Sequence, residues 1–207
     1  MGIRSLFGSL REKIVSKNVR IVFPEGNDER VVRAAARLKF EGLIEPIILG
    51  DATEVRNLLT KLGFADQDYT IINPEDYTDF EHMKQEFVEI RKGKATIEDA
   101  EQLLKDVNYF GVMLVKLGLA DGMVSGAIHS TADTVRPALQ IIKTKPGISR
   151  TSGVFLMNRE TTDQRLIFAD CAINIEPDEQ ELAEIAINTA DTAKIFDIDP
   201  KIAMLSF

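Results

Sequence analysis

The sequence contains one cysteine, two histidines and no long apolar run, and each shortage excludes a class of protein. A single cysteine, Cys171, cannot form an internal disulfide, so we expect a reducing compartment such as the cytoplasm. No run of about 18 apolar residues occurs, so we expect no transmembrane helix. Residues 1–15 mix apolar and charged side chains, which favours an amphipathic helix over a secretory signal.

Positive charge is also scarce, because 25 Lys and Arg face 33 Asp and Glu, which gives a formal net charge of −8. That balance argues against nucleic acid or an anionic membrane as a partner. The histidines, the cysteine and the carboxylates do not have metal-ligand spacing, so we expect no metal. Glycine-rich nucleotide loops of the GxGxxG or GxxxxGK type are missing as well. Individual arginines would therefore have to bind any anionic ligand.

The remaining composition is that of an ordinary globular protein, with 44% hydrophobic and 28% charged residues among 207. From residue 20 onward, short apolar runs alternate with amphipathic stretches, which predicts a parallel sheet inside a three-layer α/β/α fold. The predicted strands are 20–24, 43–49, 69–72 and 121–126, and the predicted helices are 28–38, 51–62, 80–92, 96–107 and 109–117.

The pattern of alternating strands and helices changes after Lys143, and Lys145-Pro146-Gly147 indicates that the preceding helix ends there. We expect a first α/β domain at 1–145 and an incomplete second domain at 146–207. The second domain is predicted to contain a hairpin (153–157 and 166–169), a long helix (177–196) and a final strand (201–207). A final core strand without a following helix would leave one face of a parallel sheet uncovered, so we expect these residues to belong to a larger folding unit.

The segment 120–137, ADGMVSGAIHSTADTVRP, joins a predicted strand to a polar helix start. Its hydroxyls (Ser130, Thr131 and Thr134), the free N–H groups of a helix start and the guanidinium of Arg136 all favour a bound phosphate or carboxylate. Ordinary helix capping explains the same hydroxyls equally well, so the spacing leaves both interpretations open.

Pro137 complicates the geometry of this helix start. Proline lacks an N–H group and restricts the residue before it. We therefore expect either Thr134 as the N-cap with Pro137 in the first turn, or a short turn that precedes a kink.

Other reactive side chains have ordinary explanations. Arg91 belongs to a basic run at a predicted helix end, and spacing alone indicates a solvated surface. His129 has no identifiable carboxylate partner, so we interpret it as a hydrogen-bonding spacer and not as a base. His82 is expected to be exposed, and Cys171 is expected to be a small buried apolar residue.

The segment 120–137 resembles a signature of the phosphate acetyltransferases, which interconvert acetyl-CoA plus phosphate with acetyl phosphate plus CoA. RIVFPEGNDERVVRAAARL (20–38), EIRKGKATIEDA (89–100) and FADCAINIEPDEQELAEIAI (168–187) resemble the same family, as does the final KIAMLSF. The resemblance implies a cytoplasmic acyltransferase, a homodimer, with two domains similar to the isocitrate and isopropylmalate dehydrogenases.

Residue roles follow from the same resemblance. It implies that Arg91 helps to hold the phosphate-bearing substrate and that Arg136 contacts CoA or the transferring group. CoA, acetyl phosphate and phosphate are then the ligands, and no cofactor is required. The family's serine, arginine and aspartate that act on the thiol and acyl group have no counterpart here, so we expect residues 1–207 alone to be inactive. A phosphate butyryltransferase and a non-catalytic acyl-CoA-binding regulatory module are the alternatives.

Overall fold

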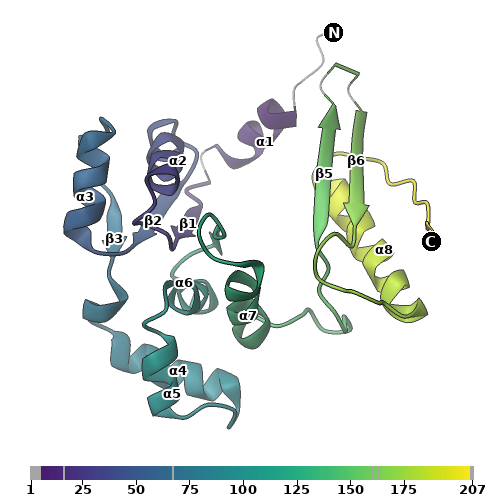
Figure 1. The fold of residues 1–207 in the computed structure, drawn as a ribbon. Helices are drawn as coiled ribbons and strands as arrows, with labels where there is room; N and C mark the ends of the chain where they lie inside the picture. The colour runs from purple at the N-terminus through teal and green to yellow at the C-terminus, as the bar shows by residue number, and fades with distance from the viewer. Residues whose placement is uncertain (1–5, 16, 67, 160, 163, 206–207) are drawn as a thin grey trace. The chain divides into compact units, whose positions relative to one another are not determined.

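The computed structural model describes residues 6–15, 17–66, 68–159, 161–162 and 164–205 (Figure 1). Its residues fall into two compact units. The larger unit is Ile14–Lys143, and the smaller unit combines the residues up to Lys13 with those from Thr144 onward. Among the described residues, no helix is both long enough and apolar enough to cross a membrane.

The larger unit is built on a four-stranded parallel sheet, as the alternation of strands and helices predicts. The strands lie in the order β3-β2-β1-β4, and Arg20 of β1 pairs with Glu45 of β2. They comprise β1 (Arg20–Phe23), β2 (Glu45–Leu49), β3 (Thr70–Ile72) and β4 (Gly122–Met123).

Strand β4 is shorter than the predicted 121–126. The N–H of Val124 still donates to the carbonyl of Val22 (2.9 Å), but Gly126 then turns the chain away with a φ of 106°. Glycine adopts such a positive φ without a steric penalty.

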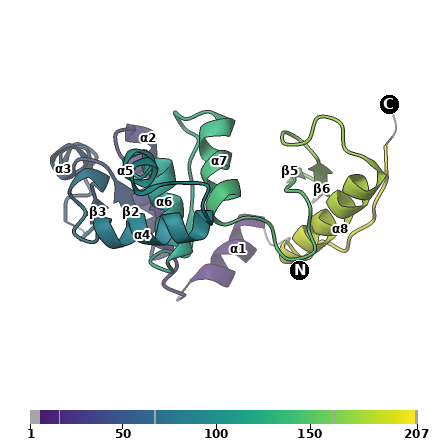
Figure 2. The same cartoon turned by 90° about the horizontal axis from the view of Figure 1, so that it is seen from below.

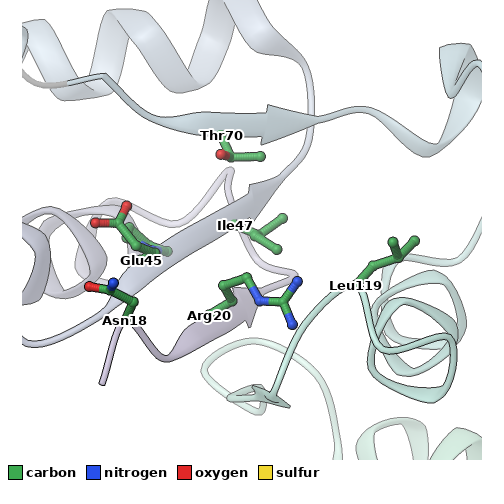
Figure 3. Close-up of a pocket in the computed structure, with 7 residues that line it drawn as sticks. Asn18, Arg20, Glu45, Ile47, Thr70 and Leu119 are labelled. Carbon is green, nitrogen blue, oxygen red and sulfur yellow. The ribbon is translucent and has the colours of Figure 1, made fainter. Parts of the chain in front are cut away.

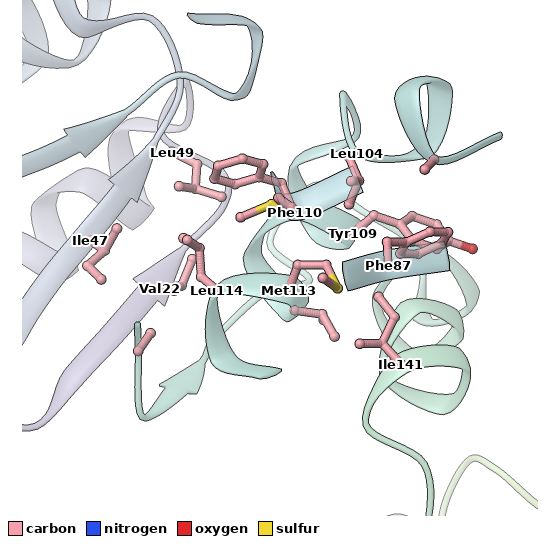
Figure 4. Packing of buried hydrophobic residues seen from close by; sticks show 14 residues of the cluster. Val22, Ile47, Leu49, Phe87, Leu104, Tyr109, Phe110, Met113, Leu114 and Ile141 are labelled. Carbon is pink, nitrogen blue, oxygen red and sulfur yellow. The ribbon is translucent and has the colours of Figure 1, made fainter. Parts of the chain in front are cut away.

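Helices cover both faces of this sheet. One core contains Phe23 and Ile48 of the strands together with apolar residues of α2 (Glu29–Phe40) and α3 (Ala52–Lys61). The other core contains Val22 and Leu49, which pack against Phe110 and its neighbours (Figure 4). Adjacent residues of one strand enter different cores because side chains alternate across a sheet. The second face is covered by α4 (Phe80–Arg91), α5 (Ile97–Leu103), α6 (Val107–Lys116) and α7 (Thr131–Ile141).

Capping side chains fix the helix starts. Asp28 accepts hydrogen bonds from the first turn of α2, at the start of the predicted helix 28–38. The predicted helices 96–107 and 109–117 have wrong boundaries, because Asp106 accepts from the N–H groups of Asn108 and Tyr109 and so begins α6 at Val107. A short 3₁₀ turn, η1 (Pro74–Asp76), separates β3 from α4.

Helix α7 begins one turn earlier than expected. Its N-cap is Ser130 and not Thr134, because Ser130 and Asp133 form a reciprocal capping box. Pro137 is buried inside the helix, so both predicted placements of this proline are wrong. The missing N–H of Pro137 leaves the carbonyl of Asp133, four residues earlier, without its helical donor.

The smaller unit contains α1 (Leu6–Ile14), an antiparallel hairpin and α8 (Glu179–Ile195). The hairpin pairs β5 (Val154–Arg159) with β6 (Gln164–Ala169), and Figures 1 and 2 both show α8 beside it. These elements confirm the predicted hairpin and long helix. The predicted final strand is wrong over 201–205, which are exposed and pair with no described strand; residues 206–207 lie outside the described residues.

Two separate sheets therefore lie on either side of residue 144. The predicted domains 1–145 and 146–207 stay a prediction, since compact units are not by themselves independently folding domains.

Candidate functional site

The candidate site lies at the carboxyl ends of β1 and β4. The chain adds β2 and β3 on one side of β1 and then returns to place β4 on the other side. Open parallel sheets place ligands outside the strand ends at such a reversal. The segments that leave these two strands, 24–28 and 124–130, are therefore where a ligand is expected.

Glu25 follows β1 and is the best-connected side chain at this position, with only 1% of its surface exposed. One carboxylate oxygen, Oε1, accepts hydrogen bonds from the backbone N–H groups of Gly126 (3.3 Å), Ile128 (2.8 Å) and His129 (3.1 Å). The other oxygen, Oε2, accepts from Ala127 (2.9 Å). The N–H groups of the loop just before α7 are thus occupied by the protein's own carboxylate, whereas the donors predicted for a ligand were those of the helix start itself.

The same carboxylate contacts an imidazole, because Nδ1 of His129 lies 2.9 Å from Oε1 of Glu25. Burial raises the pKa of Glu25, but hydrogen bonds from Ile128, Ala127 and His129 outweigh burial and lower that pKa to about 2. Glu25 is therefore ionised at neutral pH. The carboxylate partner that His129 lacked in the sequence lies 104 positions away along the chain.

The three predicted hydroxyl donors have different surroundings. Ser130 caps α7, since its Oγ accepts from the N–H of Asp133 (3.2 Å). Thr131 is exposed at the first turn. The Oγ1 atom of Thr134 is buried and has no hydrogen-bond partner within the described ranges, and a side chain at Gly126 would approach it to 3.8 Å. Only Thr134 keeps an unused buried donor.

Arg91 and Arg136 come from two helices, α4 and α7, that contact each other. Arg91, the last residue of α4, donates from Nη1 to the carbonyl of Gln140 (3.2 Å), and the Tyr109 hydroxyl donates to Oε1 of Gln140 (3.1 Å). Burial raises the pKa of Tyr109, while the positive charges of Arg136 and then Arg91 partly oppose that rise. Both guanidinium groups therefore act on the Tyr109 hydroxyl.

The two arginines differ in exposure. The Arg91 side chain is partly buried, and its Nε is buried without a partner among the residues the structure describes. Arg136 is exposed on α7. Arg91 thus contacts the helix that carries Arg136, while Ser130 and Thr131 belong to the helix start one turn and more before Arg136.

A buried amide connects this arginine group to the loop after β4. Asn108 has no exposed surface, its Oδ1 accepts from the hydroxyl of Ser125 (2.6 Å), and its Nδ2 has no partner within the described ranges. Sequence reasoning missed Asn108, Tyr109 and Glu25. Glu25 had a usable signal, because a carboxylate directly after an apolar strand and before a glycine lies at the ligand end of a parallel sheet.

Two pockets occur in the larger unit. The wider one, about 550 Å³, lies at the amino ends of the strands, beside Arg20, Glu45 and Thr70 (Figure 3). Arg20 is already paired there with Asp121, so this pocket offers no uncompensated cation to an anionic substrate. The narrower one, about 290 Å³, adjoins Glu25 and Ser125 at the carboxyl ends. Arg30, which lines the smaller pocket, is likewise paired, with Asp28 (2.7 Å), so it is the position at the carboxyl ends that favours this end of the sheet.

Three other reactive side chains, those of His82, Cys171 and Asp170, are either exposed or used in local hydrogen bonds. His82 is exposed, as predicted. Cys171 is only partly buried, and its thiol donates to the carbonyl of Phe168 (3.0 Å), so the prediction of full burial is wrong. Asp170 accepts N–H bonds from Gly153 and Asn174, among others, which supports a turn-forming role; burial raises its pKa, but these bonds hold that pKa well below its usual value.

Comparison with known proteins decides the family. Residues 5–207 match the sequence model of the phosphate acetyl/butaryl transferases. The chain belongs to this family. It is 55% identical to a phosphate acetyltransferase of Bacillus subtilis over 98% of its length, and 56% identical to one of Staphylococcus aureus. The matches cover 62% and 61% of those proteins, so the chain spans about three fifths of their length.

Solved structures agree with this assignment. A phosphotransacetylase from Streptococcus pyogenes superposes with a TM-score of 0.96 at 84% identity, covering all of this chain and 63% of that one. A phosphotransacetylase from Staphylococcus aureus superposes with a TM-score of 0.89 at 55% identity, covering 98% of this chain and 61% of that one. The α/β fold of this family member is therefore shared with both.

Proposed function

We propose that the whole protein carrying this chain transfers an acetyl group reversibly between CoA and phosphate. The observation that carries the proposal is the contact of Arg91 with α7, the helix that carries Arg136, in a chain 55% identical to a protein named phosphate acetyltransferase. Phosphate, acetyl phosphate and CoA are all anionic, and a guanidinium binds such oxygens through paired, charge-assisted hydrogen bonds. Two arginines on different helices suit two anionic substrates.

The reaction needs charge stabilisation more than it needs a cofactor. A base removes the proton of the CoA thiol, the thiolate attacks the carbonyl carbon of acetyl phosphate, and the bond to the phosphate oxygen breaks. Arg91 would help to hold the leaving phosphate from the end of α4, and Arg136, whose guanidinium has no hydrogen bond to the described residues, would contact CoA or the transferring group. We assign the unused hydroxyl of Thr134, with Ser130 and Thr131, to substrate contacts, and we assign no base among these residues.

Three further features rest on the family resemblance. We propose that the whole protein is a cytoplasmic homodimer, and that its architecture has two domains similar to the isocitrate and isopropylmalate dehydrogenases, divided near residue 145. Size-exclusion chromatography with light scattering would measure the oligomeric state directly. A monomer at micromolar concentration would contradict the dimer.

The activity is tested with the whole purified protein by following CoA-dependent consumption of acetyl phosphate. Butyryl phosphate is offered in parallel, because the matching family includes both kinds of transferase. We expect turnover of acetyl phosphate that is lowered in Arg136→Gln and unchanged in Arg37→Gln, since Arg37 is an exposed arginine of α2 paired with Glu41. Preference for butyryl phosphate would indicate a butyryltransferase, and CoA binding without turnover would indicate a binding module.

A further inference from the structure

Glu25 and His129 form a contact that the proposed reaction does not yet use. The carboxylate is buried, it accepts four backbone N–H groups of the loop after β4, and it also contacts the imidazole. A buried charge without compensation is very costly, so the number of donors around this one indicates that the loop is built around it.

The geometry determines which ring nitrogen of His129 carries a proton. An ionised carboxylate only accepts hydrogen bonds, so Nδ1 of His129, 2.9 Å from Oε1, must be the donor. The other ring nitrogen, Nε2, has no hydrogen-bond partner within the described part of the chain, and the side chain is 24% exposed. A carboxylate that fixes one imidazole nitrogen leaves the second free for a ligand.

The position of this imidazole is what gives it a function. His129 directly precedes Ser130, the N-cap of α7, which is the helix that carries Arg136. The loop that Glu25 anchors is the segment that leads into the arginine-bearing helix.

We propose that Glu25 is a positioning residue for acetyl transfer, which anchors loop 126–129 and fixes His129 with its proton on Nδ1 so that Nε2 hydrogen-bonds the substrate. The catalytic part rests on the proposed function, whereas the proton position does not. Glu25 itself touches no substrate, because its carboxylate is enclosed by the loop.

The proton position is measured first, by nitrogen-15 NMR of the imidazole rings at alkaline pH, where free imidazole is neutral. The signal of the His129 ring is assigned by its loss from the spectrum in His129→Gln. We expect the Nδ1–H form for His129. A spectrum that shows the Nε2–H form would overturn the proposal, whether or not the protein proves to be a transferase.

The catalytic part is measured by a double-mutant cycle in the whole protein, with Glu25→Gln, His129→Gln and the pair. Glutamine keeps the shape of Glu25, but its NH₂ group would face either the N–H of Ala127 or the donors at Oε1. Two donors that face each other cannot form a hydrogen bond, so the loop would lose part of its anchor. We expect each single variant to lose about tenfold to a hundredfold in kcat/KM, and the pair to lose no more than the worse single variant. Additive losses, or unchanged kinetics in folded His129→Gln, would overturn the proposal.

Folding is controlled separately. Glu54→Gln removes an exposed carboxylate of α3 and should change nothing, and Glu25→Asp keeps the charge and should recover part of the activity if Glu25→Gln misfolds. A whole protein that turns over no acetyl phosphate would refute the proposed function, while the NMR measurement would still decide the state of His129.

Discussion

Arg91 and Arg136 differ in how much of their hydrogen-bonding capacity the protein itself uses. Arg91 donates to the carbonyl of Gln140, whereas Arg136 is exposed and makes no hydrogen bond to the described residues. Five donors of Arg136 thus remain available for a phosphate. The sequence could point to Arg91 only through the family resemblance, because a basic run at a helix end is by itself most often solvated, whereas the place of Arg136 beside a polar helix start already favoured an anion.

Replacing Arg136 by Gln should lower kcat/KM by about tenfold to a few hundredfold, since a charged hydrogen bond contributes about 1.5 to 3 kcal/mol. Its melting temperature should not change. Arg91→Gln should lower both kcat/KM and the melting temperature, because it also loses the bond to Gln140. Steady-state kinetics and calorimetry of both variants, with Arg37→Gln as the control, make this comparison. Normal kinetics in a folded variant would show that this arginine is a solvated surface residue without a role in the reaction.

Glu25 should make the stability of the protein depend on pH in the acid range. Its pKa is about 2 when folded against an ordinary 4.5, so the unfolded chain binds the proton more tightly. The stabilisation is fully present above pH 4.5 and is lost as the pH falls toward 2, and the difference corresponds to about 3 kcal/mol. Urea unfolding from pH 6 to 2 of wild type and Glu25→Gln measures it. Equal pH slopes in the two proteins would contradict this prediction.

At the scale of secondary structure, helix α7 shows how a local motif sets a boundary. Ser130 and Asp133 satisfy each other's N–H groups, which begins the helix before the proline is reached. Ser130→Ala should lower the free energy of unfolding by about 0.5 to 2 kcal/mol, because the N–H of Asp133 loses its acceptor. Chemical denaturation measures the change, with Thr131→Ala as the neutral control at an exposed site. An equal effect of both substitutions would show that the capping box contributes nothing.

The turn after β1 depends on a close backbone contact. A Cβ atom at Gly26 would lie 2.2 Å from the carbonyl oxygen of Leu49, which cannot move because it accepts the Gly26 N–H (3.1 Å). Gly26→Ala should therefore cost about 1 to 3 kcal/mol or more of stability. Gly42→Ala is the matched control: it has open space but a φ of 66°, so it should cost only about 1 kcal/mol. Thermal unfolding that ranks the two in the reverse order would refute the close-contact argument.

Local patterns predicted most elements because capping residues and apolar spacing are short-range signals. Such signals are the helix starts at Asp28 and Asp178 and the apolar run of the strand at 20–24. The site was harder, because its key contacts join distant segments: Glu25 reaches His129 only after the sheet has placed β4 beside β1. The same limit explains the wrong strand at 201–205, since an apolar run forms a strand only when another strand pairs with it.

At the scale of the whole molecule, the relatives are longer than this chain, which spans about three fifths of them. The larger unit supplies arginines, a positioned imidazole and buried amide and hydroxyl donors at the carboxyl ends of the sheet. We propose that these groups bind and orient anions. Transfer also requires a base for the thiol and donors for the developing oxyanion, and proximity and electrostatic stabilisation each contribute several kcal/mol to such a reaction.

Residues 1–207 produced alone should therefore show negligible turnover of acetyl phosphate, while the larger unit still binds phosphate weakly through Arg136. The assay follows CoA-dependent loss of acetyl phosphate, after mass spectrometry has confirmed that the protein ends at Phe207. The whole protein is the positive control, and Arg136→Gln in the shorter protein tests whether the residual phosphate binding depends on that guanidinium. Turnover of the shorter protein near that of the whole protein would show that these residues contain the base, and His129, with its Nε2 free, would then be the first group to test.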